Sequence, residues 1–233
     1  MAHPHSTDTR MQKDYITDSP DIEAIELWNS QCFITENPYH TMLQEALRNS
    51  IYDDIGELNA TVQSEVAVTA KANLAESELD FLDRDNADIQ TLNVFLSDLI
   101  TTIATDVNQP FWPEDAEAYA TIVESWYHVT RNGGYHDAHS HPNCSWCGIY
   151  YLDIGDSDFT RRNGLNRFYD PRVNADHYLD AGSQYLNGTG IWDIEPKNGQ
   201  IVIFPSYLKH SALPYFGDKD RIVIAFNARV DFL

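Results

Sequence analysis

The chain has 233 residues, of which 42% are hydrophobic and 12% aromatic, so it can bury a core and is not expected to be disordered. Its 36 acidic residues against 15 basic ones give a formal charge of −21. Such a field repels phosphates and anionic lipid head groups, which argues against nucleic-acid or membrane binding through a basic patch. It does not exclude an anionic cosubstrate, because one buried arginine can set the local potential.

The cysteine content and the hydropathy favour a reducing, cytoplasmic location. No apolar run approaches the roughly 18 residues of a membrane span, and the N-terminus lacks a signal-peptide core. Three cysteines, Cys32, Cys144 and Cys147, are too few for a disulfide framework. Cys144 and Cys147 flank the start of a predicted strand, where residues three apart point to opposite faces. The sequence therefore predicts structural thiols and not a joint metal or redox site.

The N-terminal half is predicted to be mainly helical. Residues 1–20 are polar and aperiodic, which is typical of a flexible tail. Apolar residues between 25 and 34 suggest a short edge strand. Apolar spacing of three and four then predicts helices over 41–58 and over about 88–104. The two prolines within 110–113 predict a turn that closes this region.

After that turn the pattern changes to strands. Short runs rich in β-branched and aromatic residues are bounded by Gly, Pro, Asn or Asp, which is typical of a sandwich or barrel. The predicted strands are 121–130, 146–153, 190–194, 200–204 and 221–230. Residues 131–134, with the sequence RNGG, are predicted to form a turn. The polar segment 155–188 has little periodicity and is predicted to be a lid-like insertion.

These elements predict one domain of the α+β class. Its helical part covers about 21–113 and its β-rich core about 114–233, so residues 21–233 form a single unit with a shared hydrophobic core. No internal repeat or linker divides the chain. A homodimer is compatible with the sequence.

Three of the nine histidines lie close together, between Tyr135 and Pro142. His139 and His141 are two residues apart at the entry to a strand, so both side chains face the same side. His210 follows the buried strand 200–204 in a short predicted loop and is the candidate for a third ligand. Imidazole suits Fe, Zn, Cu and Ni, and three ligands on one face leave open coordination positions.

Four ordered motifs resemble the 2-oxoglutarate/Fe(II) oxygenase superfamily, and more narrowly its oxygenase family with the pattern H-x-H-P-N, S-G-x-Y-Y, F-P-S-x-x-x-H and R-x-x-x-x-F-N. The corresponding segments are 139–143, 148–152, 204–210 and 221–227, and the second begins at the glycine of its pattern because Cys147 stands in the place of the serine. The resemblance covers about residues 121–230. It implies a double-stranded β-helix (jelly roll, cupin-like) with the N-terminal helices packed on its outside.

Position by position, the resemblance implies that His139 and His210 are ligands of Fe(II). Most members carry Asp or Glu two residues after the first histidine, where this chain has His141. Three neutral imidazoles give the site one negative charge less than two histidines and a carboxylate would, so the bound cosubstrate must neutralise more of the metal's charge. Asp137 is an alternative carboxylate ligand, although its spacing is reversed; His141 is the favoured third ligand.

The resemblance also implies a site for 2-oxoglutarate. Arg221 lies eleven residues after His210, where the superfamily has a basic residue that binds the distal carboxylate. A guanidinium can donate two parallel hydrogen bonds to a carboxylate. A second polar contact is expected from Tyr150 or Tyr151, because Val occupies the position that often carries Ser or Thr. Asn143 and Asn227 are candidates for contacts around the metal or with the substrate.

The implied reaction is oxidation of 2-oxoglutarate by molecular oxygen to succinate, coupled to hydroxylation of a small molecule, amino acid or peptide. Two alternatives stay open. A cupin-type dioxygenase with three histidine ligands would need no 2-oxoglutarate, although Arg221 argues against it. A metal-stabilised jelly-roll binding module would form no succinate.

Overall fold

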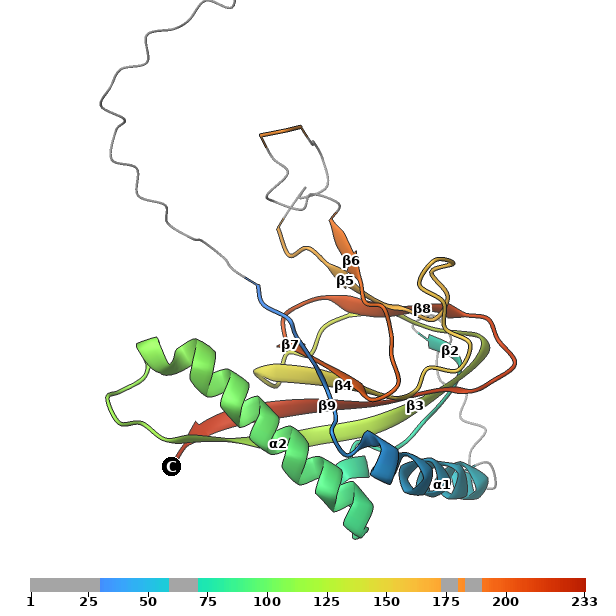
Figure 1. Ribbon diagram of the computed structural model, residues 1–233, viewed down its shortest axis with the longest axis horizontal. Helices are drawn as coiled ribbons and strands as arrows, with labels where there is room; N and C mark the ends of the chain where they lie inside the picture. The colour runs from blue at the N-terminus through green and yellow to red at the C-terminus, as the bar shows by residue number, and fades with distance from the viewer. Residues whose placement is uncertain (1–29, 59–70, 173–179, 183–189) are drawn as a thin grey trace, which may run out of the picture.

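The two predicted helices are present in the computed structural model, which describes residues 30–58, 71–172, 180–182 and 190–233. They are α1 (His40–Leu58) and α2 (Ala87–Asn108), and both lie against the same face of a β-sheet (Figure 1). The side chain of Asn86 caps α2 by accepting hydrogen bonds from the backbone N–H groups of Asp88 and Ile89. Among the described residues, no helix is long and apolar enough to span a membrane.

The described strands form one curled sheet with antiparallel pairing. In chain order they are β1 (Phe33–Glu36), β2 (Lys71–Glu76), β3 (Ala118–His139), β4 (Trp146–Asp153), β5 (Asn166–Tyr169), β6 (Ile191–Asp193), β7 (Gln200–Pro205), β8 (His210–Tyr215) and β9 (Arg221–Phe232). Their order across the sheet is β1-β7-β4-β9-β3-β8-β5-β6, and β2 pairs with β3 beside this path. The sheet bends over so that β5, β6 and β8 face β4 and β7 (Figure 1). The predicted α+β class is confirmed.

The long strand β3 makes this curl. The prediction of a turn at 131–134 is wrong, because β3 continues through these residues with a bend. Before the bend β3 pairs with β9, and after it with β8. Gly133 adopts a φ of +82°, which favours glycine, and the pairing with β8 shifts register after Gly134. The glycines therefore redirect the strand into the second layer instead of ending it.

Alternation along the strands separates two cores. On β4, Tyr150 and Leu152 belong to the large core that includes buried residues of α1 and α2. Cys147, Ile149 and Tyr151 belong to a smaller core inside the curled sheet. Because successive strand residues point to opposite faces, β4 supplies both cores at once.

Three strands were not predicted, namely β2, β5 and β8. The segment 155–188 is not a structureless lid throughout, since β5 lies within it and pairs with both β6 and β8. Residues 173–179 and 183–188 of the predicted lid lie outside the described residues, as does the predicted tail 1–20. Strand β5 has only four residues, which leave a periodic signal too short to separate from a loop.

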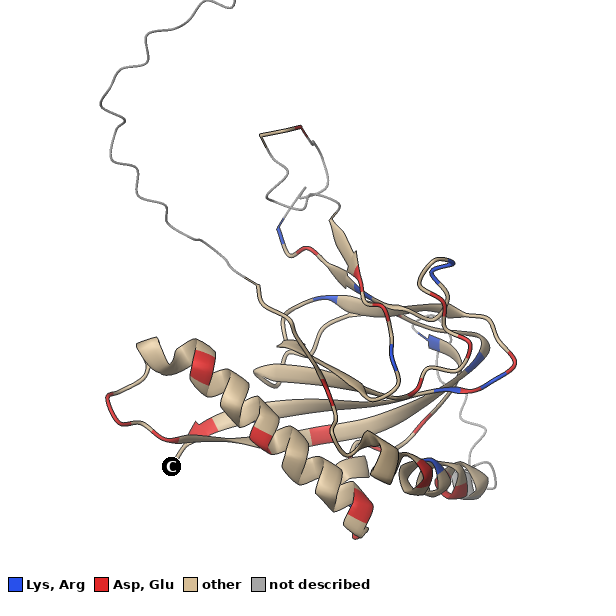
Figure 2. Ribbon diagram, in the orientation of Figure 1, with Lys and Arg blue, Asp and Glu red and all other residues tan. Residues whose placement is uncertain are grey.

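Charge is distributed unevenly over this fold (Figure 2). Helix α2 carries three aspartates and no lysine or arginine, and its exposed face is therefore acidic. Most basic residues lie instead on the strands and loops of the curled sheet (Figure 2). The strong negative charge of the chain is nevertheless compatible with a buried arginine inside the curled sheet, Arg221.

Candidate metal and cosubstrate site

Strand pairing brings three of the predicted histidines together. His139 is the last residue of β3 and pairs in register with His210, the first residue of β8. His141 follows β3, where its backbone N–H donates a hydrogen bond to the carbonyl of Ser206 at 3.1 Å. One ring nitrogen from each histidine lies within 4.8 Å of those of the other two, and this is the group of potential metal ligands among the described residues.

Backbone carbonyls fix the tautomer of two of these histidines. Nδ1–H of His139 donates to the carbonyl of Asp137 at 2.8 Å, and Nδ1–H of His210 donates to the carbonyl of Leu208 at 3.0 Å. A carbonyl can only accept, so Nδ1 carries the proton and Nε2 keeps its lone pair. Metal-binding histidines in proteins are commonly oriented by such a contact on the other ring nitrogen.

His141 has a different environment. Its Nδ1 lies 3.4 Å from Nδ2 of Asn227, and that amide donates a hydrogen bond to Glu124 at 2.7 Å. The third imidazole of the cluster thus has a carboxylate two contacts behind it.

Burial keeps the three imidazoles neutral. It lowers the pKa of His210 to about 3, with a further contribution from the neighbouring His139. Burial likewise lowers the pKa of His141 to about 4 and that of His139 below its ordinary value. Only neutral imidazole binds a metal ion, so the cluster is in the ligating form at physiological pH.

Arg221 occupies the other end of the interior. It is 1% exposed, and its Nη2–H donates to Oδ1 of Asn166 at 2.7 Å. The same oxygen accepts the hydroxyl of Tyr151 at 2.8 Å, and the guanidinium also lies over the Tyr151 ring. Nε of Arg221 has no hydrogen-bond partner, and none of the described carboxylates forms an ion pair with it.

The histidines and Arg221 line one cavity of about 450 Å³ that is open to solvent. Arg221, Val223, Ala225 and Asn227 alternate along β9 and all face it. Further lining residues come from β3, β5 and β7, and they include Trp126, His128, His136, Asn166 and Phe204.

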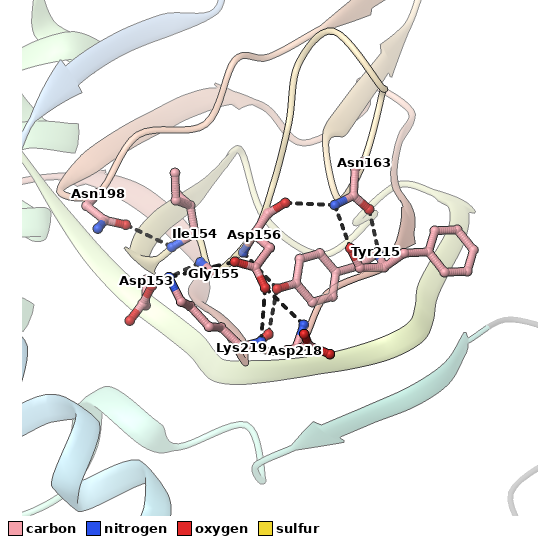
Figure 3. Close-up of polar contacts among 10 residues, drawn as sticks. Asp153, Ile154, Gly155, Asp156, Asn163, Asn198, Tyr215, Asp218 and Lys219 are labelled. Carbon is pink, nitrogen blue, oxygen red and sulfur yellow. Dashed lines mark hydrogen bonds and ion pairs between the residues drawn. The ribbon is translucent and has the colours of Figure 1, made fainter.

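A polar network holds the loops beside Arg221 (Figure 3). Oδ2 of Asp156 accepts the backbone N–H groups of Asp218 and Lys219, while the Asp156 N–H donates to the hydroxyl of Tyr215. Asn163 bridges the carbonyls of Asp156 and Phe216. Gly164 packs against both Tyr215 and the Arg221 side chain, and a Cβ at this position would collide with the Tyr215 ring. The network therefore fixes the wall against which the guanidinium packs.

Several predicted site residues lie outside this cavity. Tyr150 faces the helices, where its hydroxyl contacts Nδ1 of His40 at 2.7 Å, and it is not among the residues that line the cavity. Asn143 is exposed and contributes only a backbone carbonyl, which accepts from Arg229. The Asp137 side chain is exposed and does not belong to the ligand cluster. Tyr151 touches the site through its neighbours Arg221 and Asn166.

The sequence did not predict two cavity residues that matter for the site's chemistry. Asn166 lies on the unpredicted strand β5, which brings it to Arg221. His136 stacks on His139 with ring centroids 4.0 Å apart. The signal in the sequence that could have placed His136 in the cavity was its position in the histidine-rich run, three residues before His139.

The interpretation of Cys144 and Cys147 as residues on opposite faces is wrong. Cys144 lies in the turn before β4, so strand alternation does not apply to it. Their Sγ atoms are 3.5 Å apart.

Comparisons with known proteins agree with this geometry. Residues 124–227, a little under half of the chain, match the family model described as "Putative 2OG-Fe(II) oxygenase". No curated protein sequence matches the chain. The match covers the segment that carries His139, His141, His210 and Arg221.

Solved structures of similar fold include a prolyl-4-hydroxylase from Pseudomonas putida, with 15% identity, a TM-score of 0.53 and coverage of 86% of this chain and 93% of that one. HygX from Streptomyces hygroscopicus, with nickel and 2-oxoglutarate bound, has 11% identity and a TM-score of 0.53, covering 86% and 83%. A prolyl hydroxylase from Trichoplax adhaerens, in complex with a peptide fragment, has 12% identity and a TM-score of 0.53, covering 85% and 83%. At such identities the likeness shows the fold, a double-stranded β-helix.

Proposed function

We infer that this chain, which the family match assigns to the 2-oxoglutarate- and Fe(II)-dependent oxygenases, hydroxylates a small molecule, an amino acid or a peptide. In this proposal His139, His141 and His210 hold Fe(II), and Arg221 binds the distal carboxylate of 2-oxoglutarate. The match confirms the predicted class of enzyme and its cofactors; the roles of the individual residues and the substrate class are proposed here.

The observation that carries the proposal is the shared cavity of three neutral histidines and one buried guanidinium. A buried cation without an anionic partner is costly, and Nε of Arg221 is left without any partner. A dicarboxylate that chelates a metal with one end and reaches Arg221 with the other satisfies both groups. Inorganic anions would satisfy Arg221 alone.

The residues present fit such a metal. Two histidines have Nε2 free because Nδ1 is held by a carbonyl, and all three are neutral. Glu124, linked through Asn227 to His141, supplies negative charge behind the position where most relatives carry a ligating carboxylate.

When bound, iron with 2-oxoglutarate supplies the oxidising chemistry, in which oxygen converts 2-oxoglutarate to succinate and carbon dioxide and oxidises the substrate. The chain's own residues bind and orient the reactants. Asn166 and Tyr151 hold the Arg221 fork in a fixed plane. Phe204 and Trp126 make part of the wall apolar and limit the access of water.

The substrate class rests on the shape of the site and on its relatives. HygX has been crystallised with hygromycin B, a small molecule, and the Trichoplax enzyme with a peptide. The cavity here opens to solvent, which is compatible with either. The cytoplasmic location, the homodimer and the absence of nucleic-acid binding stay predictions.

The three-histidine cluster also favours a second candidate, a cupin-type dioxygenase that needs no 2-oxoglutarate. The two differ in the use of Arg221, which has no role in the second. A binding experiment therefore separates them.

Calorimetric titration of 2-oxoglutarate into the anaerobic Fe(II)-loaded protein tests the proposal. We expect saturable binding, and Arg221→Ala should raise the dissociation constant on the order of a hundredfold, since a buried charge-assisted pair contributes about 3 kcal/mol. Arg221→Lys should weaken binding less, because a point charge replaces the fork.

Arg229→Ala is the matched control. Arg229 lies on the same strand but is exposed and contacts only the carbonyl of Asn143, so its loss should not affect binding. Succinate formation under oxygen should follow the same order among the variants. Equal binding by the wild type and Arg221→Ala, or no binding by either, would favour the cupin-type reaction.

A further inference from the structure

Cys144 and Cys147 form a close dithiol beside the histidine cluster. Cys144 lies in the turn that precedes β4 and is half-buried, while Cys147 is 2% exposed and lines the cavity. Their Sγ atoms are 3.5 Å apart, and a disulfide requires about 2.05 Å, so an approach of roughly 1.5 Å closes the bond. The neighbouring Asn143 is exposed and lies in a turn outside the paired residues of β4.

Both thiols contact groups that position His141. The Cys144 thiol points to the carbonyl of His141, with an S···O distance of 3.8 Å. The Cys147 thiol donates to Oδ1 of Asn227 at 3.2 Å, and the amide nitrogen of Asn227 lies 3.4 Å from the His141 ring. A disulfide sulfur carries no proton, so oxidation removes both donors and moves the turn that follows His141.

We propose that Cys144 and Cys147 are a site of reversible disulfide formation, and that this bond weakens metal binding through His141. The oxidant is a peroxide. The half-buried Cys144 sulfur attacks hydrogen peroxide, the O–O bond breaks, and one water leaves with a sulfenic acid formed. The Cys147 sulfur then attacks that sulfur, the S–O bond breaks and a second water leaves. Two thiols and one peroxide thus give one disulfide and two waters, and an external dithiol reverses the oxidation.

The order of attack follows from burial. Cys147 is enclosed between the small core and Asn227, so peroxide reaches Cys144 first. The sulfenic acid on Cys144 then has a thiol in contact, which traps it before further oxidation. The disulfide itself does not depend on the proposed function, whereas the effect on the metal rests on it.

The test uses the full chain carrying Cys32→Ser, which removes the third cysteine. Metal-free protein is compared in three states: reduced, treated with hydrogen peroxide that is then removed, and treated again with dithiothreitol. Mass spectrometry of a non-reducing digest should show a loss of about 2 Da from the peptide that contains both cysteines, reversed by dithiothreitol. Anaerobic Co(II) titration, followed by the absorption of the bound ion, should show affinity at least tenfold lower in the oxidised state.

Cys144→Ser is the matched control, because serine keeps a donor for the His141 carbonyl and leaves the Cys147 contact in place. Peroxide should not change its Co(II) affinity. A gain of about 32 Da on Cys144 without a disulfide would overturn the assignment of the pair. A disulfide that leaves Co(II) affinity unchanged would overturn the coupling to His141. If even the reduced protein binds no Co(II), the proposed metal site fails and the coupling with it, while the mass still decides whether the pair forms a disulfide.

Discussion

Two substitutions of Asn166 should change the stability of the metal-free protein in opposite directions, although both should weaken the binding of 2-oxoglutarate. Asn166 is buried, and its Oδ1 accepts both the Arg221 guanidinium at 2.7 Å and the Tyr151 hydroxyl at 2.8 Å. Asn166→Ala leaves two buried donors without this acceptor. A hydrogen bond to a charged group contributes about 1.5–3 kcal/mol and a neutral one about 1 kcal/mol, so the metal-free protein should lose about 3 kcal/mol of unfolding free energy.

Asn166→Asp should act in the opposite direction on stability. Its carboxylate would lie against a buried guanidinium that has no anionic partner among the described residues, and the pair should stabilise the metal-free protein. The same carboxylate would compete with 2-oxoglutarate for Arg221 and repel the cosubstrate, so Asn166→Asp should bind 2-oxoglutarate more weakly than the wild type. Asn166→Ala should also bind it more weakly, because the Arg221 guanidinium loses the contact that fixes its plane.

Urea unfolding of the metal-free variants, with calorimetric titration of 2-oxoglutarate into the metal-loaded ones, measures both effects. The reasoning is refuted if Asn166→Ala unfolds within about 0.5 kcal/mol of the wild type, or if Asn166→Asp binds 2-oxoglutarate as tightly as the wild type. In the first case Asn166 does not hold the guanidinium. In the second, Arg221 is not where the cosubstrate binds.

Three further predictions concern the metal, the packing and the pH dependence. His139→Ala should abolish Co(II) binding, whereas Asp137→Ala should keep it, as measured by anaerobic titration. Gly148→Ala places a Cβ about 2.0 Å from an aromatic ring of β9 and should lower the unfolding free energy by about 3 kcal/mol, while Gly56→Ala, with open space on α1, should not destabilise. Backbone N–H groups hold the pKa of Asp156 below its ordinary value, so its contribution to stability is present above about pH 4 and is lost as the pH falls through the folded-state pKa. The protection of the amides it caps, measured as the exchange rate relative to the intrinsic rate at each pH, should therefore fall in acid, and Asp156→Ala should show reduced protection already at neutral pH.

The sequence was informative wherever a signal is local. Spacing of three and four predicted both helices to within a few residues, because each buries one stripe against the sheet. The run 146–153 was predicted with its observed bounds, since it is apolar and bounded by turn residues. The ordered motifs pointed to the family that the comparisons support, because a motif holds its residue types at fixed spacing whatever the fold around it.

Contacts between distant segments were decided only by the tertiary structure. Alternation predicts that Tyr150 and Tyr151 face opposite ways, but which of them faces the helices depends on the layer that covers each side of the sheet. Asn166 reaches Arg221 because β5 pairs with β8, a pairing between short strands that no local pattern marks. Cys144 and Cys147 meet because the chain enters β4 from a turn, where the strand rule that separated them does not hold.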